Sequence, residues 1–387
     1  MDSDEGNLSF VEDAPPERLP SDTVQLVFLL IVLIVGLPSN CLVFSRILTL
    51  YKASHKDSVK AGFLLLKLNL AISDLMLLFF YALPKLLWNI TYEWKGTDSM
   101  CKTHNYLSMA SYYLSSNIIV CIALDRLRTV LGASKIRRGK STRSIRLLVF
   151  FAWFFAFAWS LPQFVVFQTV DVLPNSNATW IQCSDVWTIN TIRKAGAPPS
   201  VPEWILRAPM QAVYELTHLL LVFWGPLVAL SISYVIIAIR LARFSMSGPQ
   251  SAAPPHLSCG GEASEARYMV DSDEVSCELV LKRERNLGPF SAISTLFRSG
   301  TRRESMLPQN RASVQPMWRR RLRGKLFRST LLIVAAHFLF WFPYNFASLV
   351  TYLSIDYKEI IAIHAYFLND LQILITLVNP MLYAIVQ

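Results

Sequence analysis

A few charged side chains interrupt long apolar stretches of this 387-residue sequence. Asp74 lies within the apolar run 60–88, and Asp125 and Arg126 close the run that follows Cys101. A carboxylate within hydrocarbon costs several kcal/mol unless it meets polar partners or a cation, and a guanidinium is always charged. Charged residues in such places indicate a bound ion or polar contacts between helices rather than catalysis. No embedded Ser/His or Asp dyad, metal-ligand spacing or phosphate loop occurs, so the pattern is not that of an enzyme.

Seven apolar stretches must position these side chains. Hydrophobic residues make up 53% of the chain and charged residues only 17%, so lipid must be the solvent for part of it. A bilayer core about 30 Å thick needs about 20 apolar residues per helix. The sequence therefore predicts an all-α membrane protein with a seven-transmembrane helix bundle. The predicted spans are 24–50, 60–88, 102–131, 145–168, 208–242, 328–353 and 359–386.

The net charge of +10 is unevenly placed along the chain. The first 22 residues are acidic, whereas the loops after the first, third and fifth spans are rich in Lys and Arg. Because positive loops stay cytoplasmic, we expect an extracellular N-terminus and a multi-pass protein of the plasma membrane. Nucleic-acid binding is the rival interpretation of the positive charge. It is disfavoured because the basic residues border hydrophobic spans.

This topology divides the chain into four parts. Residues 1–23 form an extracellular tail, 24–244 hold the first five transmembrane helices, and 319–387 hold the last two. Residues 245–318 lose hydrophobic periodicity and gain Ser, Gly, Pro and Arg, which predicts a long, disordered third cytoplasmic loop. The sequence stops four residues after Tyr383. Either the protein has no cytoplasmic tail, or the sequence is truncated.

Two of the six cysteines, Cys101 and Cys183, are extracellular in this topology. A disulfide between them is the natural pairing in an oxidising compartment, and two free thiols are the alternative. As a helix, the segment from Cys101 to Arg126 covers about 37 Å, which places its ends at opposite membrane faces. Three acceptor patterns for N-glycosylation also fall outside, at Asn7, Asn89 and Asn177.

Seven short motifs, each in the matching span, resemble the rhodopsin-like (class A) G-protein-coupled receptors. They are Gly36-Leu37-Pro38-Ser39-Asn40, Leu70-Ala71-Ile72-Ser73-Asp74, Asp125-Arg126-Leu127, Trp153, Pro226, Phe340-Trp341-Phe342-Pro343-Tyr344 and Asn379-Pro380-Met381-Leu382-Tyr383. The resemblance implies a receptor that couples to a heterotrimeric G protein.

The resemblance also implies residues that switch the receptor. Asp125 would hold Arg126 until activation, and Tyr234 and Tyr383 would share a water bridge in the active state. For the two tyrosines, interfacial anchoring is the alternative. Helix six would move about Pro343 beside Trp341, and helix seven about Pro380. Arg323 stands where many relatives carry a glutamate that forms an ion pair with the arginine equivalent to Arg126. This ionic lock is therefore expected to be absent.

The resemblance implies no cofactor apart from an allosteric sodium ion. Asp74 would face Ser115, Thr376 and Asn379, which together could ligate sodium and water. A hydrogen-bonded cluster without an ion is the alternative. Where relatives carry bulky apolar residues that repack during activation, this sequence has Ser116 and His337.

Three shorter patches resemble the gonadotropin-releasing hormone and adipokinetic hormone receptors. They are Trp88-Asn89-Ile90-Thr91 with Trp94, Leu161-Pro162-Gln163-Phe164, and Gln211-Ala212-Val213-Tyr214. This narrower resemblance implies an extracellular peptide ligand and coupling to phospholipase C. The implied ligand-binding residues are Lys85, Asn89, Ser108, Gln211, Tyr214, Trp341, Tyr344, Asn345 and Asn369.

Two of the implied ligand-binding positions depart from this subfamily. Vertebrate members carry an aspartate at Lys85 and a lysine at Ser108. Lys85 would favour an acidic or carbonyl-rich part of the ligand, or its side chain would reach out to the membrane surface.

Two other functions are weighed against a peptide receptor. The same fold could serve another peptide or a small ligand. A transporter would require inverted repeats, paired broken helices or ionisable residues across the bilayer, and none is found. Asp74 is the one mid-span carboxylate with a clear polar neighbourhood.

Overall fold

The computed structural model describes residues 15–54, 58–131, 140–173, 179–192, 201–246, 317–353 and 368–385. Within these ranges, six helical segments are long and apolar enough to cross a membrane. They are Pro20–Ala53, Lys60–Thr91, Asp98–Leu131, Arg143–Val166, Pro209–Arg240 and Leu331–Thr351. Each of the first six predicted spans overlaps one of them, and the seventh is described only from residue 368.

The first half of the chain is helical up to a short hairpin. Its elements are α1 (Pro20–Ala53), α2 (Ser58–Leu77), the π-helical turn η1 (Leu78–Ala82), α3 (Leu83–Thr91), α4 (Asp98–Leu131), α5 (Lys140–Ser160), α6 (Gln163–Val166), β1 (Phe167–Asp171) and β2 (Ile181–Asp185).

Within the described ranges, the second half of the chain is helical wherever it is regular. Its elements are α7 (Val186–Ile192), α8 (Glu203–Leu206), α9 (Ala208–Leu219), the π-helical turn η2 (Leu220–Trp224), α10 (Gly225–Met246), α11 (Met317–Leu353), the 3₁₀ turn η3 (Gln372–Leu374) and α13 (Ile375–Ile385). Residues 245–318 thus lie almost entirely outside the described ranges, and the four-part division of the chain stays a prediction.

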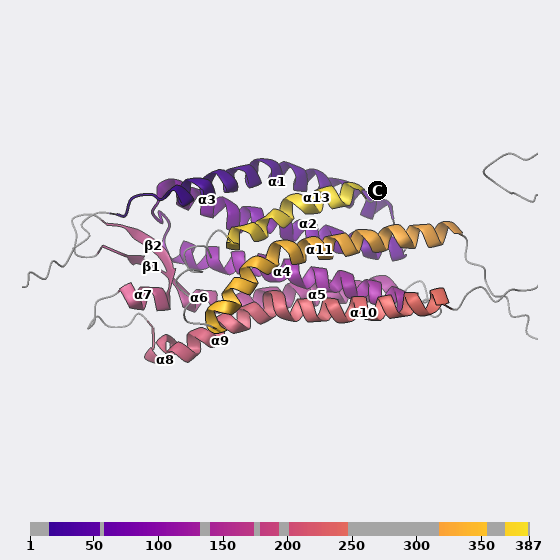
Figure 1. The fold of residues 1–387 in the computed structure, drawn as a ribbon. Helices are drawn as coiled ribbons and strands as arrows, with labels where there is room; N and C mark the ends of the chain where they lie inside the picture. Colours follow the sequence, from indigo (N-terminus) through magenta and orange to yellow (C-terminus); the bar gives the residue numbers. More distant parts are fainter. Residues whose placement is uncertain are drawn as a thin grey trace, which may run out of the picture. The chain divides into compact units, whose positions relative to one another are not determined.

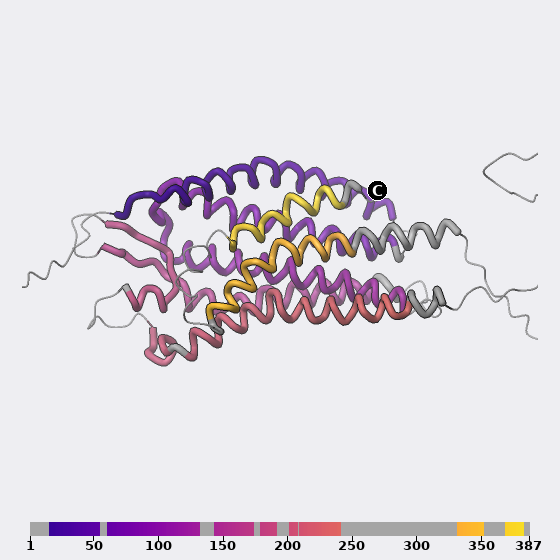
Figure 2. The backbone as a smooth tube through the Cα atoms, in the orientation of Figure 1, coloured from indigo at the N-terminus to yellow at the C-terminus, as the bar shows by residue number. Residues whose placement is uncertain are grey.

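Helix α4 is the central helix of the bundle. It contacts α2, α5 and α10, while α1 lies beside α2 and α13 (Figure 1). Large apolar side chains are exposed along α1, α5 and α10, for example Ile34, Phe150 and Val228. Such an apolar surface suits contact with lipid. The backbone polar groups of a helix need no water there, because they are paired within the helix. The backbone trace in Figure 2 shows α11 and α13 side by side.

Three prolines leave backbone carbonyls that polar side chains from other helices satisfy. Proline has no N–H to donate to the carbonyl four residues earlier, so Pro84, Pro226 and Pro380 each free one acceptor. The hydrogen bonds to these acceptors are Ser108 Oγ to Phe80 O (2.8 Å), Ser116 Oγ to Val222 O (2.7 Å) and Asn40 Nδ2 to Thr376 O (2.7 Å). Ser116 therefore has a structural partner at a position where relatives carry an apolar residue.

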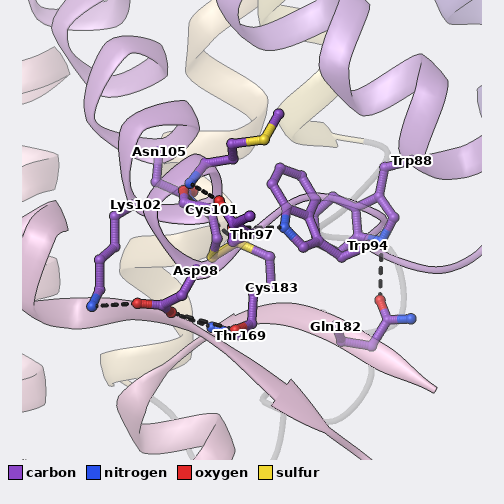
Figure 3. Close-up of a disulfide and its surroundings, with 11 residues drawn as sticks. Trp88, Trp94, Thr97, Asp98, Cys101, Lys102, Asn105, Thr169, Gln182 and Cys183 are labelled. Carbon is purple, nitrogen blue, oxygen red and sulfur yellow. Dashed lines mark hydrogen bonds and ion pairs between the residues drawn. A yellow bond between two sulfur atoms is a disulfide. The ribbon is translucent and has the colours of Figure 1, made fainter. Parts of the chain in front are cut away.

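A β-hairpin lies at one end of the bundle, and the sequence patterns did not predict it. Strands β1 and β2 pair antiparallel, with Thr169 opposite Cys183. The structure contains the predicted disulfide between Cys183 and Cys101, with the two Cα atoms 5.7 Å apart (Figure 3). The Asp98 carboxylate accepts the Thr169 backbone N–H at 2.9 Å. Strand β1, with the sequence Phe167-Gln168-Thr169-Val170-Asp171, does not alternate apolar and polar residues, so it lacks the usual signal of a half-buried strand.

Candidate functional site

The end of the bundle that carries the disulfide, hereafter the disulfide end, holds a buried carboxylate. Asp370 is fully buried and accepts the Lys85 ammonium at 2.7 Å and the Tyr81 hydroxyl at 2.8 Å. The Gln25 side-chain amide donates to its second oxygen. These contacts tie α1, η1 and α3 to residues 368–371. The expectation that Asp74 alone has a polar neighbourhood was wrong, because Asp370 has three side-chain donors.

Side-chain amides extend this network towards α11. The Asn89 amide donates to Gln25 at 2.9 Å, and the Asn369 amide donates to Tyr81 at 3.0 Å. Gln372 donates to Asn369 at 2.7 Å and accepts from Asn345 at 3.3 Å. We call Gln25, Tyr81, Lys85, Asn89, Asn345, Asn369, Asp370 and Gln372 the outer polar network.

Two buried polar atoms of α11 beside this network have no hydrogen-bond partner among the described residues. They are Asn345 Oδ1 and the indole Nε1 of Trp341. An unmet acceptor and an unmet donor one helical turn apart suit a polar ligand or ordered water, because buried polar groups are rarely left unpaired. Tyr344, another predicted ligand-binding residue, is half-buried between them in sequence.

The other predicted ligand-binding residues already have partners outside the outer polar network. Ser108 donates to the Phe80 carbonyl, and the Gln211 amide donates to Glu215 at 2.9 Å. Tyr214 and Gln163 exchange hydrogen bonds of 2.7 and 3.0 Å, and Trp187 of α7 packs on the Tyr214 ring. The structure thus joins two of the three short patches, since Gln163 and Tyr214 come from different ones.

The third patch covers the disulfide. The Trp88 and Trp94 rings meet edge to face with centroids 5.2 Å apart, and Trp94 packs against Cys101 and Cys183 (Figure 3). Trp88 Nε1 donates to Gln182 of β2 at 3.1 Å. This cluster and the disulfide fix the hairpin to α3 and α4.

A stack of aromatic rings leads from the outer polar network into the bundle. Tyr112 lies between Tyr81 and Trp341, with centroid separations of 5.3 and 5.5 Å. The Trp341 and His337 rings are 4.1 Å apart. His337 also lines a cavity of about 260 Å³ between α10 and α11, together with the half-buried Tyr234. These rings form a continuous line of contacts from the outer polar network to α11.

Asp74 lies in a fully buried polar cluster in the same bundle. The Asn379 amide donates to both Asp74 oxygens, at 3.1 and 3.0 Å. Ser115 Oγ, Asn379 Oδ1 and Asn40 Oδ1 are buried and have no hydrogen-bond partner among the described residues. Asn379 is the residue of these three that contacts Asp74, and a carboxylate with neutral oxygens is a set of ligands that a small hard cation accepts. Thr376, the fourth expected ligand, is buried and its hydroxyl donates to the Ile373 carbonyl.

The opposite end of the bundle, hereafter the Arg126 end, holds the other candidate charges. Arg126 is 7% exposed and forms an ion pair with Asp125 at 3.1 Å. Its guanidinium carbon lies 4.3 Å from the ring centroid of Phe63, and the Lys67 ammonium lies 4.7 Å from the same centroid. The side chains of Tyr383 and Arg323 lie outside the part of the chain that the structure describes.

Comparison with known proteins identifies the family. The profile of the 7 transmembrane receptor (rhodopsin family) matches residues 39–383. The chain belongs to the rhodopsin family of seven-transmembrane receptors. It is therefore a multi-pass membrane protein and a G-protein-coupled receptor, in a family of receptors rather than enzymes.

Several curated receptors are similar to this one. G-protein coupled receptor daf-38 of Caenorhabditis elegans is 29% identical, over 95% of this chain and 90% of its own. The gonadotropin-releasing hormone receptor of Octopus vulgaris is 29% identical, over 58% of this chain and about half (49%) of its own. The annetocin receptor of Eisenia fetida is 24% identical, over 81% of this chain and 68% of its own.

The structure describes one of the three predicted glycosylation positions of the receptor, Asn89. Asn7 and Asn177 lie outside the described residues. Asn89 is half-buried, and its amide nitrogen, the atom to which a glycan attaches, donates to Gln25. This geometry favours a place for Asn89 in the outer polar network.

Several site residues of the receptor were missed from sequence. Asp370, in predicted span seven, is opposite in charge to Lys85, a predicted ligand-binding residue in span two, and testing the two as a pair would have pointed to their ion pair. Tyr81 and Tyr112 resemble ordinary core aromatics, and nothing in their spacing marks them. Phe63 and Lys67 are separated by one helical turn, which hints at a shared helix face but not at Arg126.

Proposed function

We propose that this receptor binds an extracellular peptide hormone at the disulfide end and activates a heterotrimeric G protein at the Arg126 end. The observation that carries the proposal is the outer polar network beneath the disulfide-fixed hairpin. Its amides and its single ion pair offer many directional hydrogen bonds and little net charge, which suits the amides and carbonyls of a peptide. Receptors named for gonadotropin-releasing hormone and annetocin are among the relatives, which supports a peptide ligand.

In this proposal the N-terminus and the disulfide end face the outside of the plasma membrane. The acidic N-terminus and the basic residues that follow the first, third and fifth spans in the sequence support this orientation. An epitope tag before residue 1 should be detected on intact cells, and a tag at residue 280 only after permeabilisation. The reverse labelling would contradict the orientation.

Ligand binding would act by population shift. A ligand that contacts Asn345 and Trp341 would bias α11 about Pro343 and, through residues 368–371, α13 about Pro380. Arg126 would then leave Asp125 and meet the G protein, with Tyr234 and Tyr383 stabilising the open state. The ligand must bind the open state more tightly than the closed one, since equal affinity shifts nothing.

A response screen tests the ligand class. Cells that express the receptor are exposed to a neuropeptide library and assayed for calcium and cyclic AMP. We expect a calcium response to at least one peptide, because we propose coupling through phospholipase C. Cells expressing Arg126→Ala at equal surface density are the matched control and should stay silent. A response to small molecules but to no peptide would contradict the peptide assignment.

We further propose that the Asp74 cluster binds sodium and that sodium favours the closed state. Agonist affinity should then fall when sodium chloride replaces choline chloride, by a coupling of roughly 5- to 150-fold. Asp74→Asn should remove this dependence, because it removes the one carboxylate of the cluster. Ser73→Ala is the matched control, since the buried Ser73 hydroxyl donates to the Leu70 carbonyl. Sodium dependence that survives Asp74→Asn would exclude the site.

A further inference from the structure

Two cations from different helices lie over one buried phenyl ring at the Arg126 end. Phe63 of α2 is 5% exposed, and its ring centroid is 4.3 Å from the Arg126 guanidinium of α4 and 4.7 Å from the Lys67 ammonium of α2. Lys67 is 6% exposed. Both distances are within the range of a cation–π contact, and the burial of all three side chains strengthens such contacts.

The contact matters because few other groups hold Arg126. Among the described residues its one ion-pair partner is Asp125, and its Nε has no hydrogen-bond partner there. The sequence supplies Arg323 rather than a carboxylate at the start of α11. The face of the Phe63 ring therefore attracts the Arg126 guanidinium, and this contact holds α4 to α2 at the Arg126 end.

Lys67 acts in the opposite direction. Its ammonium competes for the negative charge density of the Phe63 ring and repels the Arg126 guanidinium, and this repulsion is strong where water is excluded. A closed state with two cations at one ring is therefore held less firmly than one with Arg126 alone.

We propose that Phe63 is a positioning residue that holds Arg126 in the closed state, and that Lys67 weakens this hold, so that the pair sets the ligand-independent activity. This inference rests on the proposed function in one respect, the movement of Arg126 away from α2 on activation. It assigns to α2 a control of basal activity in a chain whose α11 lacks the usual acidic partner.

The test changes the electrostatics of the Phe63 ring while keeping its shape. Mono-, di- and trifluorophenylalanine at position 63 withdraw charge from the ring face in steps. Spin labels at Leu131 of α4 and Leu331 of α11, both exposed, report opening of the Arg126 end in purified receptor without ligand. Cys41, Cys121, Cys259 and Cys277 are replaced by serine in this background.

The open fraction should rise with each added fluorine, and Phe63→Leu should raise the open-to-closed ratio roughly 5- to 30-fold. Lys67→Met should lower the ratio, and Lys67→Arg should leave it close to that of the parent. Basal nucleotide exchange by the G protein should follow the same order. The spin-label distances need neither ligand nor G protein, so they test the clamp even if the ligand class is wrong.

Phe157 of α5 is the matched control for fluorination, because its ring packs on Tyr106 and Trp153. The same substitutions there should leave the open fraction unchanged. An open fraction that is constant across the fluorinated series at position 63, or a Lys67→Met variant that opens further, would overturn the inference. Thermal unfolding of both fluorinated series measures any effect on packing, and we expect the fall in stability to be of equal size at positions 63 and 157.

Discussion

Replacing Asp370 with alanine is expected to destabilise the folded receptor by about 3 kcal/mol, because the substitution leaves the Lys85 ammonium without its carboxylate. Removal of one member of a buried ion pair costs about 3–5 kcal/mol, and the lower value applies since the Lys85 side chain keeps 16% of its exposure. Tyr81 and Gln25 also lose an acceptor. Thermal unfolding of the purified receptor in lipid nanodiscs measures the loss.

The double variant Lys85→Met with Asp370→Leu separates stability from function. It removes both charges and fills similar volume, so its stability should return to within about 1 kcal/mol of the parent, because buried pairs are often replaceable by apolar groups. Agonist potency should stay low, since the outer polar network no longer connects α1, α3 and residues 368–371.

An exposed ion pair supplies the control for this prediction. Glu93 and Lys95 pair near the hairpin, with 64% of the Lys95 side chain exposed. Removal of either should cost less than about 1 kcal/mol, as is usual for surface pairs. Equal losses at Asp370 and Glu93, or full potency in the double variant, would show that the Lys85–Asp370 pair has no special role.

Breaking the Cys101–Cys183 disulfide is expected to reduce ligand binding strongly. Cys101→Ser, Cys183→Ser and the double variant should share the same defect, because each removes one bond that joins α4 to β2. A native disulfide contributes about 2–5 kcal/mol. The lower part of that range applies, since α4 and α5 remain helical within the bilayer when the hairpin detaches.

Asp98 provides the comparison for the disulfide. Its carboxylate accepts the Thr169 N–H and pairs with Lys102 at 2.6 Å, so Asp98→Asn weakens the same hairpin without touching the sulfurs (Figure 3). We expect a smaller loss of affinity, measured by saturation binding of a labelled agonist. Single cysteine variants that differ from the double variant, or that bind normally, would contradict the role given to the disulfide.

The helices were predictable because each span must be long and apolar. A bilayer imposes this requirement independently of packing, so six predicted spans overlap helical segments of the described chain. The disulfide followed from topology, because the sidedness of the loops left one extracellular pair of cysteines. The family was recognisable from motifs such as Asp125-Arg126-Leu127, whose order matches the spans.

The outer polar network was not predictable, because it depends on which faces of α1, α3 and residues 368–371 meet. Lys85 was expected either to meet the ligand or to reach the membrane surface, and the structure pairs it with Asp370, a partner that neither expectation named. The hydrogen bond from Ser116 to the Val222 carbonyl was likewise not predictable, since the carbonyl that Pro226 frees lies on another helix. Such contacts arise from rotation of helices about their axes, which hydrophobicity alone leaves open.

In the proposed mechanism, a ligand at the disulfide end opens the Arg126 end. The most direct measurement is the distance between spin labels at Leu131 and Leu331, with and without an agonist peptide found in the response screen. We expect a population at longer distance that grows with agonist occupancy and is absent when a non-activating peptide is added. Saturating agonist binding that leaves the distance distribution unchanged would show that the ligand does not open the Arg126 end.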